Sequence, residues 1–253
     1  MTGACITFVG NEGVVVSTPS GTVAIDALFG HGAANYADVP DAVLDAIEAA
    51  RSPFDAIDLF LATHYHPDHF NPRALTRHLR SNTRSRFLST PQAVRLLGGD
   101  GNEPLGIENR IHATRPPEGE RETTELCGFR VDAFGLSHGR VNFGDVEHNG
   151  YVVRIGGLSI LHLGDGIIDE KALDGAGVLS EPVDIAFLPF WFLTYPYGQR
   201  LMSTKLRPRH TFAVHIPPSE QSRIEAEIAD FAPRVVALTR SMSRHEIGKG
   251  MCL

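Results

Sequence analysis

Three imidazoles and one carboxylate lie within six residues of this 253-residue chain, in the segment His64-Tyr-His66-Pro-Asp68-His69. Imidazole and carboxylate together suit zinc, iron, manganese and related divalent ions. In an extended segment His64 and His66 point to the same side, and Pro67 then fixes a turn that lets Asp68 and His69 face a second position. The segment predicts a metal site, so the chain must adopt a fold that brings further ligands to this place.

Further candidate ligands stand at the ends of predicted strands. An apolar strand at 57–63 leads directly into the histidine segment. His138, Asp165 and His215 each come at the end of a later strand, and the glycines beside Asp165 permit a tight turn. A lone histidine at a strand end is more often structural than a ligand. Together with the histidine segment, and in this order along the chain, the three residues favour a centre for two adjacent ions.

The rest of the chain alternates short strands and helices in two similar halves. Asn71-Pro72 and Thr90-Pro91 each predict a helix start, with a side-chain cap followed by proline at the first helical position. Residues 99–123, rich in glycine, proline and charge, predict a loop around a short strand at 109–113. These elements predict one compact layered domain over residues 1–253. Its other strands are expected at 6–9, 14–18, 22–28, 129–134, 151–155, 158–163, 184–188, 211–215 and 235–238, and further helices at 40–50 and 224–231.

Composition places the chain among ordinary folded proteins, with 42% hydrophobic and 21% charged residues. The formal net charge of −7 does not favour nucleic acid as a partner, because phosphate-backbone binders usually carry a basic balance. We recognise no signal peptide and no run that approaches ~18 apolar residues, so no membrane partner is expected. Cys5, Cys127 and Cys252 are odd in number and far apart, which favours reduced thiols in a cytoplasmic protein.

The ordered candidate residues resemble the five motifs of the metallo-β-lactamase superfamily. The matching positions are Asp26, the histidine segment at 64–69, His138, Asp165 and His215, and the resemblance covers nearly the whole chain. It implies an α/β fold, a four-layer αβ/βα sandwich of two mixed β-sheets flanked by helices. It also places the metals at the edge between the two sheets.

The same resemblance implies a role for each candidate residue. His64, His66 and His138 would hold one ion, Asp68, His69 and His215 the other, and Asp165 would bridge both. Asp26 would orient the metal loop without binding an ion, since such outer carboxylates set the orientation and tautomer of imidazoles. His162 lies three residues before Asp165 and is more readily a supporting or core residue than a ligand.

The expected chemistry follows from the ligands. Two ions, most readily zinc with manganese or iron as alternatives, can hold a bridging hydroxide at neutral pH. That hydroxide would attack a carbonyl or phosphoryl centre, and Asp68 would orient the water and shuttle a proton. The expected substrate is a small ester, lactone or phosphoester, and family members often form homo-oligomers.

The segment 148–165 resembles most closely the compact bacterial branch related to L-ascorbate-6-phosphate lactonase. Gly166 departs from that branch, which usually has a threonine there. The antibiotic-hydrolysing β-lactamases would carry a signal peptide, and many use a cysteine in place of Asp165. Flavodiiron proteins resemble a His-x-Glu-x-Asp pattern, from which His66 departs. Large RNA-processing members carry an inserted domain or a long basic arm, and neither is visible in this sequence.

An aromatic segment at 190–197 precedes His215, and Pro196 indicates that it forms a loop. Trp191, Tyr195 and Tyr197 could line a substrate pocket near the metals or cover a subunit interface. Packing of the segment into the core is an equally good interpretation.

Three other functions stay open at this point. An iron-binding redox or sensing protein could use the same ligands, and an RNA or DNA phosphodiesterase could use the same chemistry. A catalytically silent domain used for association is the third alternative, and the intact ligand set argues against it.

Overall fold

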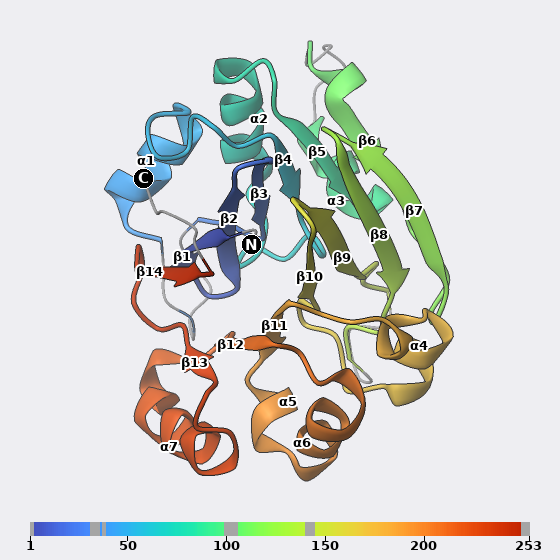
Figure 1. Cartoon of the computed structure of the whole chain (residues 1–253). Helices are drawn as coiled ribbons and strands as arrows, with labels where there is room; N and C mark the ends of the chain where they lie inside the picture. The colour runs from blue at the N-terminus through green and yellow to red at the C-terminus, as the bar shows by residue number, and fades with distance from the viewer. Residues whose placement is uncertain (1–2, 31–35, 37–38, 99–105, 140–144, 249–253) are drawn as a thin grey trace.

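Two seven-stranded β-sheets face each other in this computed structural model, and helices cover the outer face of each sheet (Figure 1). The structure describes residues 3–30, 36, 39–98, 106–139 and 145–248. Both sheets are mixed, which confirms the four-layer αβ/βα sandwich expected from the sequence.

The first sheet has the order β14-β1-β2-β3-β4-β5-β6. Strands β14 to β3 pair antiparallel, whereas β3 to β6 pair parallel. Apolar side chains of helices α1, α2 and α3 pack on its outer face. The elements of this half are β1 (Ala4–Gly10), β2 (Gly13–Thr18), β3 (Gly21–Ile25), α1 (Asp41–Glu48), β4 (Leu59–Leu61), α2 (Pro72–Ser81), β5 (Arg86–Ser89), α3 (Pro91–Leu97), the 3-10 helix η1 (Glu108–Arg110), β6 (Ile111–Ala113) and β14 (Arg244–Ile247).

The second sheet has the order β13-β12-β11-β10-β9-β8-β7, with the same division into an antiparallel and a parallel part. Helices α4 to α7 cover its outer face. Its elements are β7 (Arg121–Leu126), β8 (Phe129–Gly135), β9 (Asn149–Ile155), β10 (Leu158–His162), α4 (Glu170–Gly175), η2 (Val178–Ser180), β11 (Ile185–Pro189), α5 (Trp191–Thr194), α6 (Pro196–Leu201), the π-helix η3 (Met202–Leu206), β12 (His210–Val214), η4 (Pro218–Glu220), α7 (Gln221–Phe231) and β13 (Val236–Ala237).

Local sequence signals explain where two helices of the first half begin. The side chain of Asn71 accepts a hydrogen bond from the backbone N–H of Ala74, and Thr90 accepts one from Ala93. Proline occupies the first helical turn of both helices, where its missing N–H removes no intrahelical bond. The predicted starts of α2 and α3 are therefore confirmed.

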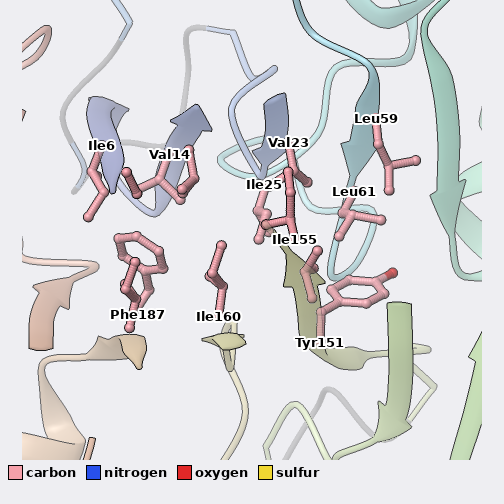
Figure 2. Close-up of a cluster of buried hydrophobic side chains, with 14 of the residues drawn as sticks. Ile6, Val14, Val23, Ile25, Leu59, Leu61, Tyr151, Ile155, Ile160 and Phe187 are labelled. Carbon is pink, nitrogen blue, oxygen red and sulfur yellow. The ribbon is translucent and has the colours of Figure 1, made fainter. Parts of the chain in front are cut away.

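The inner faces of the two sheets form one shared core. Figure 2 shows Ile6, Val14 and Ile25 of the first sheet pointing towards Ile160 and Phe187 of the second. Each fully buried side chain of this size contributes about 1.5–3 kcal/mol relative to an exposed one. This core holds the two sheets together, and the candidate ligands lie at one edge of the sandwich.

Several elements differ from the sequence-based expectations. Part of the predicted loop at 99–123 forms the start of strand β7, and strand β14 was not predicted at all. Both strands lie at sheet edges, where charged side chains stay in contact with solvent. Their sequences are therefore polar and lack the apolar pattern that predicts a strand. The aromatic segment at 190–197 is not a loop, because it forms α5 and the start of α6. Residues 99–105 lie outside the described part.

The cysteine expectation is wrong for Cys5, which is disulfide-bonded, while Cys127 is a free thiol. Cys252 lies outside the described residues. The disulfide removes the cysteine-based reason for expecting a cytoplasmic protein. Among the helices that the structure describes, none is both long and apolar enough to cross a membrane.

Candidate metal centre

Strand ends from both sheets meet at one edge of the sandwich and carry the predicted ligands. Asp26 follows β3, and His64 comes shortly after the neighbouring parallel strand β4. His138, Asp165 and His215 follow β8, β10 and β12 in the second sheet. Since parallel neighbours end at the same sheet edge, this topology brings residues far apart in the chain to one place.

A first group contains the side chains of His64, His66, His138 and Asp165, which each offer a ligand atom within 4.8 Å of the others. His138 Nε2 lies 3.1 Å from His64 Nε2 and 3.3 Å from Asp165 Oδ2. His64 Nε2 lies 4.0 Å from the same carboxylate oxygen. The group could therefore hold a metal ion between three imidazoles and one carboxylate oxygen.

A second group contains Asp68, His69 and His215. The other oxygen of Asp165, Oδ1, lies 2.9 Å from His215 Nε2 and 3.2 Å from His69 Nε2. Asp68 Oδ2 lies 3.4 Å from His69 Nε2 and 3.7 Å from His215 Nε2. Ligand atoms bonded to one ion at about 2 Å lie roughly 3 Å apart, so these spacings suit a metal.

Unmatched polar atoms in the second group support this fit. His69 Nε2, His215 Nε2 and Asp165 Oδ1 are buried, and within the described residues they have no hydrogen-bond partner. Buried polar atoms normally find a partner, because desolvation without one is costly. A cation shared by the three atoms would supply it.

Asp26 and Thr63 set which nitrogen of two histidines faces the centre. Asp26 Oδ2 lies 2.9 Å from His69 Nδ1 and accepts a hydrogen bond from Thr63 Oγ1 at 2.7 Å. Because the Thr63 hydroxyl donates its single proton to Asp26, its oxygen accepts a hydrogen bond from His64 Nδ1 at 3.0 Å. Both imidazoles then carry the proton on Nδ1 and turn the lone pair of Nε2 towards the centre.

The backbone of the centre holds conformations that non-glycine residues rarely adopt. Asp26 has a φ of 48°, His215 a φ of 61° and Asn11 a φ of 45°. Left-handed φ values of this kind persist only where the surrounding contacts hold them, and they cluster at functional sites. Both Asp26 and His215 are buried; His215 is a candidate ligand, and Asp26 contacts His69.

The turn between β1 and β2 adds two residues that sequence reasoning missed. Asn11 Nδ2 donates to Asp68 Oδ2 and to the Asp68 backbone carbonyl, both at 3.2 Å. Glu12 is fully buried, and a carboxylate oxygen of its side chain lies within 4.8 Å of ligand atoms of Asp165 and His215. A glutamate in a Gly-Asn-Glu-Gly turn has the composition of a solvated hairpin, so no local signal marks it as part of a centre.

Tyr36 and His148 also border the centre. The ring of Tyr36 lies edge-on to His215 at a centroid distance of 4.1 Å. Burial and the neighbouring Asp165 carboxylate raise the pKa of Tyr36 to about 12, so its phenol is protonated at neutral pH. His148 lies 5.3 Å from His64 between ring centroids, and burial together with His138 lowers the pKa of His148 to about 3.

Burial and close charges determine the electrostatics of the centre. Burial and the nearby His69 hold the pKa of His64 well below its usual range. Burial would also lower the pKa of His69, but Asp165 holds it well above its usual range. Burial would raise the pKa of Asp165, but His215 and His69 hold it well below. The carboxylates therefore create a site that attracts positive charge, whether a proton on His69 or a metal ion.

The structure brings together all seven residues predicted as ligands, with Asp26 behind them. His162 lies apart from the two groups, since its Nε2 donates to the backbone carbonyl of Glu12 at 3.1 Å. Among the predicted pocket residues, only the Trp191 ring lies against a ligand, 5.3 Å from His215 between centroids. Tyr195 and Tyr197 are exposed, and they flank Pro196 at the start of α6. Tyr197 contacts Glu170 and Arg200 instead.

Comparison with solved structures finds the same fold in proteins of low sequence identity. Igni18, a metallo hydrolase from the archaeon Ignicoccus hospitalis, matches with a TM-score of 0.65 and 14% identity over 98% of this chain and 100% of that chain. YhfI from Bacillus subtilis, a metallo-β-lactamase fold protein, matches with a TM-score of 0.66 and 12% identity over 97% and 100%. CmlA, a diiron β-hydroxylase from Streptomyces venezuelae, matches with a TM-score of 0.61 and 16% identity over 96% of this chain and 54% of that chain.

Sequence comparison identifies the family directly. None of the curated proteins matches the chain significantly. A family model of the beta-lactamase superfamily domain matches residues 5–210, which is most of the chain and includes all the candidate ligands except His215. The chain belongs to the metallo-β-lactamase superfamily.

Proposed function

We propose that the chain is a metal-dependent hydrolase with two divalent ions, acting on a small ester, lactone or phosphoester. The position of Asp165 carries this proposal. Its Oδ2 lies close to His138, and its Oδ1 lies close to His69 and His215. One carboxylate therefore contacts imidazoles of both groups. A bridging carboxylate of this kind is what two adjacent ions require.

The proposed ligand sets follow the two groups. His64, His66 and His138 would hold one ion, Asp68, His69 and His215 the other, and Asp165 both. Zinc suits this mixture of imidazole and carboxylate, as do manganese and iron. When bound, two such ions lower the pKa of water and polarise the oxygen of a carbonyl or phosphoryl group.

The side chains around the ligands would position the reactants. Asn11 holds the Asp68 carboxylate from one side, and we assign Asp68 to orient the attacking water and to take up its proton. The rings of Tyr36 and Trp191 lie against His215 and border the second group. The first group is the more open of the two to a substrate, because three of its four members are partly exposed whereas the second group is buried.

A lactone or a phosphate-bearing small molecule is the leading substrate class. The resemblance of segment 148–165 to the L-ascorbate-6-phosphate lactonase branch supports it. Gly166 sets a limit on that resemblance, because a Cβ there would lie 2.7 Å from Leu136 Cδ1 and 3.0 Å from the Leu163 carbonyl oxygen. The threonine usual in that branch would not fit here without movement of Leu136, so the substrate need not be the same.

A purified chain loaded with zinc or manganese should hydrolyse members of a panel of lactones, thioesters and phosphodiesters. His66→Ala should lose metal and lower the rate by roughly 100-fold or more, since it removes a proposed ligand. His210→Ala, which changes an exposed histidine at the start of β12, should keep both.

An iron redox protein is the second candidate, because CmlA is named as a diiron β-hydroxylase and shares the fold. Metal analysis separates the two functions. Redox-active iron in the purified chain, with no hydrolysis of any panel member, would replace the hydrolase proposal by this one.

A further inference from the structure

Glu12 is a buried carboxylate that the proposed ligand sets do not use. It lies in the turn between β1 and β2, and its side chain is fully shielded from solvent. Throughout the described part of the chain, nothing donates a hydrogen bond to either of its carboxylate oxygens. A buried carboxyl group without a hydrogen-bond partner is costly in either protonation state, so this side chain requires an explanation.

The turn that carries Glu12 is held in place from several directions. The backbone N–H of His215 donates to the carbonyl of Asn11 at 3.0 Å, and His162 Nε2 lies 3.1 Å from the carbonyl of Glu12. A Cβ on Gly13 would lie 2.8 Å from the Asp26 carbonyl oxygen, so the chain packs tightly there. Glu12 therefore cannot reach solvent without disturbing loops that carry the ligands.

His162 does not neutralise Glu12, although its Nδ1 lies 3.9 Å from Glu12 Oε2. The backbone N–H of Gly164 donates to that Nδ1 at 3.1 Å, so the nitrogen is an acceptor and carries no proton. The proton of His162 lies on Nε2, which donates to the backbone carbonyl of Glu12. The other titratable groups around Glu12 are the carboxylates of Asp165, Asp26 and Asp68 and the imidazole of His69.

The Glu12 carboxylate lies within reach of the second group. One of its oxygens, an oxygen of Asp165 and a nitrogen of His215 all lie within 4.8 Å of one another. A carboxylate oxygen of Glu12 forms a similar set with Asp26 and His69. Acidic groups outnumber the imidazoles around Glu12, and a metal ion shared with Asp165 and His215 would offset this excess of carboxylates.

We propose that Glu12 is a ligand of the ion held by Asp68, His69, Asp165 and His215. This inference rests on the two-ion arrangement of the proposed function and makes the two positions chemically unequal. One position offers three imidazoles and one carboxylate, whereas the other offers two imidazoles and three carboxylates. Carboxylate-rich sets suit manganese and iron, which take more ligands than the four usual for zinc. The second position should therefore prefer manganese or iron.

The test compares the wild-type chain with Glu12→Gln, which keeps the shape and removes the charge. Glu147→Gln is the matched control, because Glu147 is also buried but accepts from the Gln92 N–H and pairs with Arg115. Each protein is stripped with a chelator and titrated with manganese, iron(II) or zinc. Bound metal is counted by mass spectrometry, and thermal unfolding is followed with and without metal. Hydrolysis is not measured.

The wild-type and Glu147→Gln chains should bind two ions, and Glu12→Gln should bind the second manganese ion at least about tenfold more weakly. Metal-free Glu12→Gln should melt no lower than the metal-free wild type, because it loses a buried carboxylate that has no donor. Metal should raise its melting temperature less than that of the wild type. Two manganese ions bound to Glu12→Gln with wild-type affinity would overturn the inference. A wild-type chain without metal would instead overturn the proposed function.

If Glu12→Gln does not fold, the wild type still decides the question. Crystals soaked in manganese would locate the ions by anomalous scattering. A Glu12 oxygen about 2.0–2.2 Å from an ion would support the inference. A Glu12 carboxylate that contacts neither ion would overturn it.

Discussion

At the scale of single residues, one aspartate controls two histidines of the centre. Asp26 accepts from Thr63 at both the backbone N–H and the hydroxyl, and its Oδ2 also lies 2.9 Å from His69 Nδ1. Through Thr63 it sets the tautomer of His64 as well. We therefore expect Asp26 to act on metal affinity without offering a ligand atom in either proposed set.

We expect Asp26→Asn to weaken metal binding about 10–100-fold, because the amide brings a donor to a position where three donors converge. Titration with manganese or zinc in competition with a chelating dye measures this. Asp184→Asn is the control, since Asp184 also accepts from a backbone N–H, that of Ser159, at a strand in the second sheet. Equal metal affinities for the two variants would show that Asp26 does not orient the ligands.

At the scale of elements, the loops after the strands carry the candidate ligands, and glycines in these loops determine how closely the loops pack. Gly164 connects β10 to Asp165 and has a φ of +52°. A Cβ there would lie 2.7 Å from both His148 Nε2 and Thr63 Oγ1. The loops after β4 and β10, which come from different sheets, can thus meet only because this residue has no side chain.

Gly164→Ala should lower the free energy of unfolding by about 2–4 kcal/mol, from left-handed strain and overpacking together. Gly128→Ala separates the two causes, because Gly128 has a φ of +79° but nothing within 4 Å of its Cβ position. It should lose only about 1 kcal/mol. Urea unfolding measures the free energy of unfolding of both variants. If both lose the same amount, the close approach of the two loops does not contribute to stability.

At the scale of the whole molecule, a charged network joins three strands of the second sheet. Asp132 of β8 is buried and pairs with Arg154 of β9 and Arg121 of β7. Thr123 donates to it at 2.6 Å. Burial would raise the pKa of Asp132, but the hydrogen bonds from Thr123 and Arg154 lower it below its usual value.

A lowered pKa in the folded state means that Asp132 stabilises the fold above its unfolded pKa of about 3.9 and loses this effect as the pH falls towards the folded value. Asp132→Asn should therefore cost about 2–3 kcal/mol at pH 7. The gap between wild type and variant should shrink below about pH 4. Urea unfolding at a series of pH values measures it, and a gap that stays constant down to pH 3 would contradict this assignment.

Much of the fold and most of the centre could be predicted from sequence because their signals are local. The caps at Asn71 and Thr90 mark helix starts through neighbouring residues. The spacing of the histidine segment needs no tertiary contact to be recognised. The edge strands β7 and β14 and the short helices α5 and α6 were missed, because pairing and burial rather than local composition determine them.

The family, the strand-end positions of the candidate ligands and the chemical types available there follow from the order of amino acids alone. Which atoms converge depends on how distant segments pack. Glu12 belongs to a polar turn in the sequence, yet packing of that turn against Asp26 and His215 buries its carboxylate beside the ligands. Tyr197 belongs to an aromatic segment before His215, yet the start of α6 leaves it exposed. Burial depends on contacts between distant segments, and these contacts have no signature in the local order of residues.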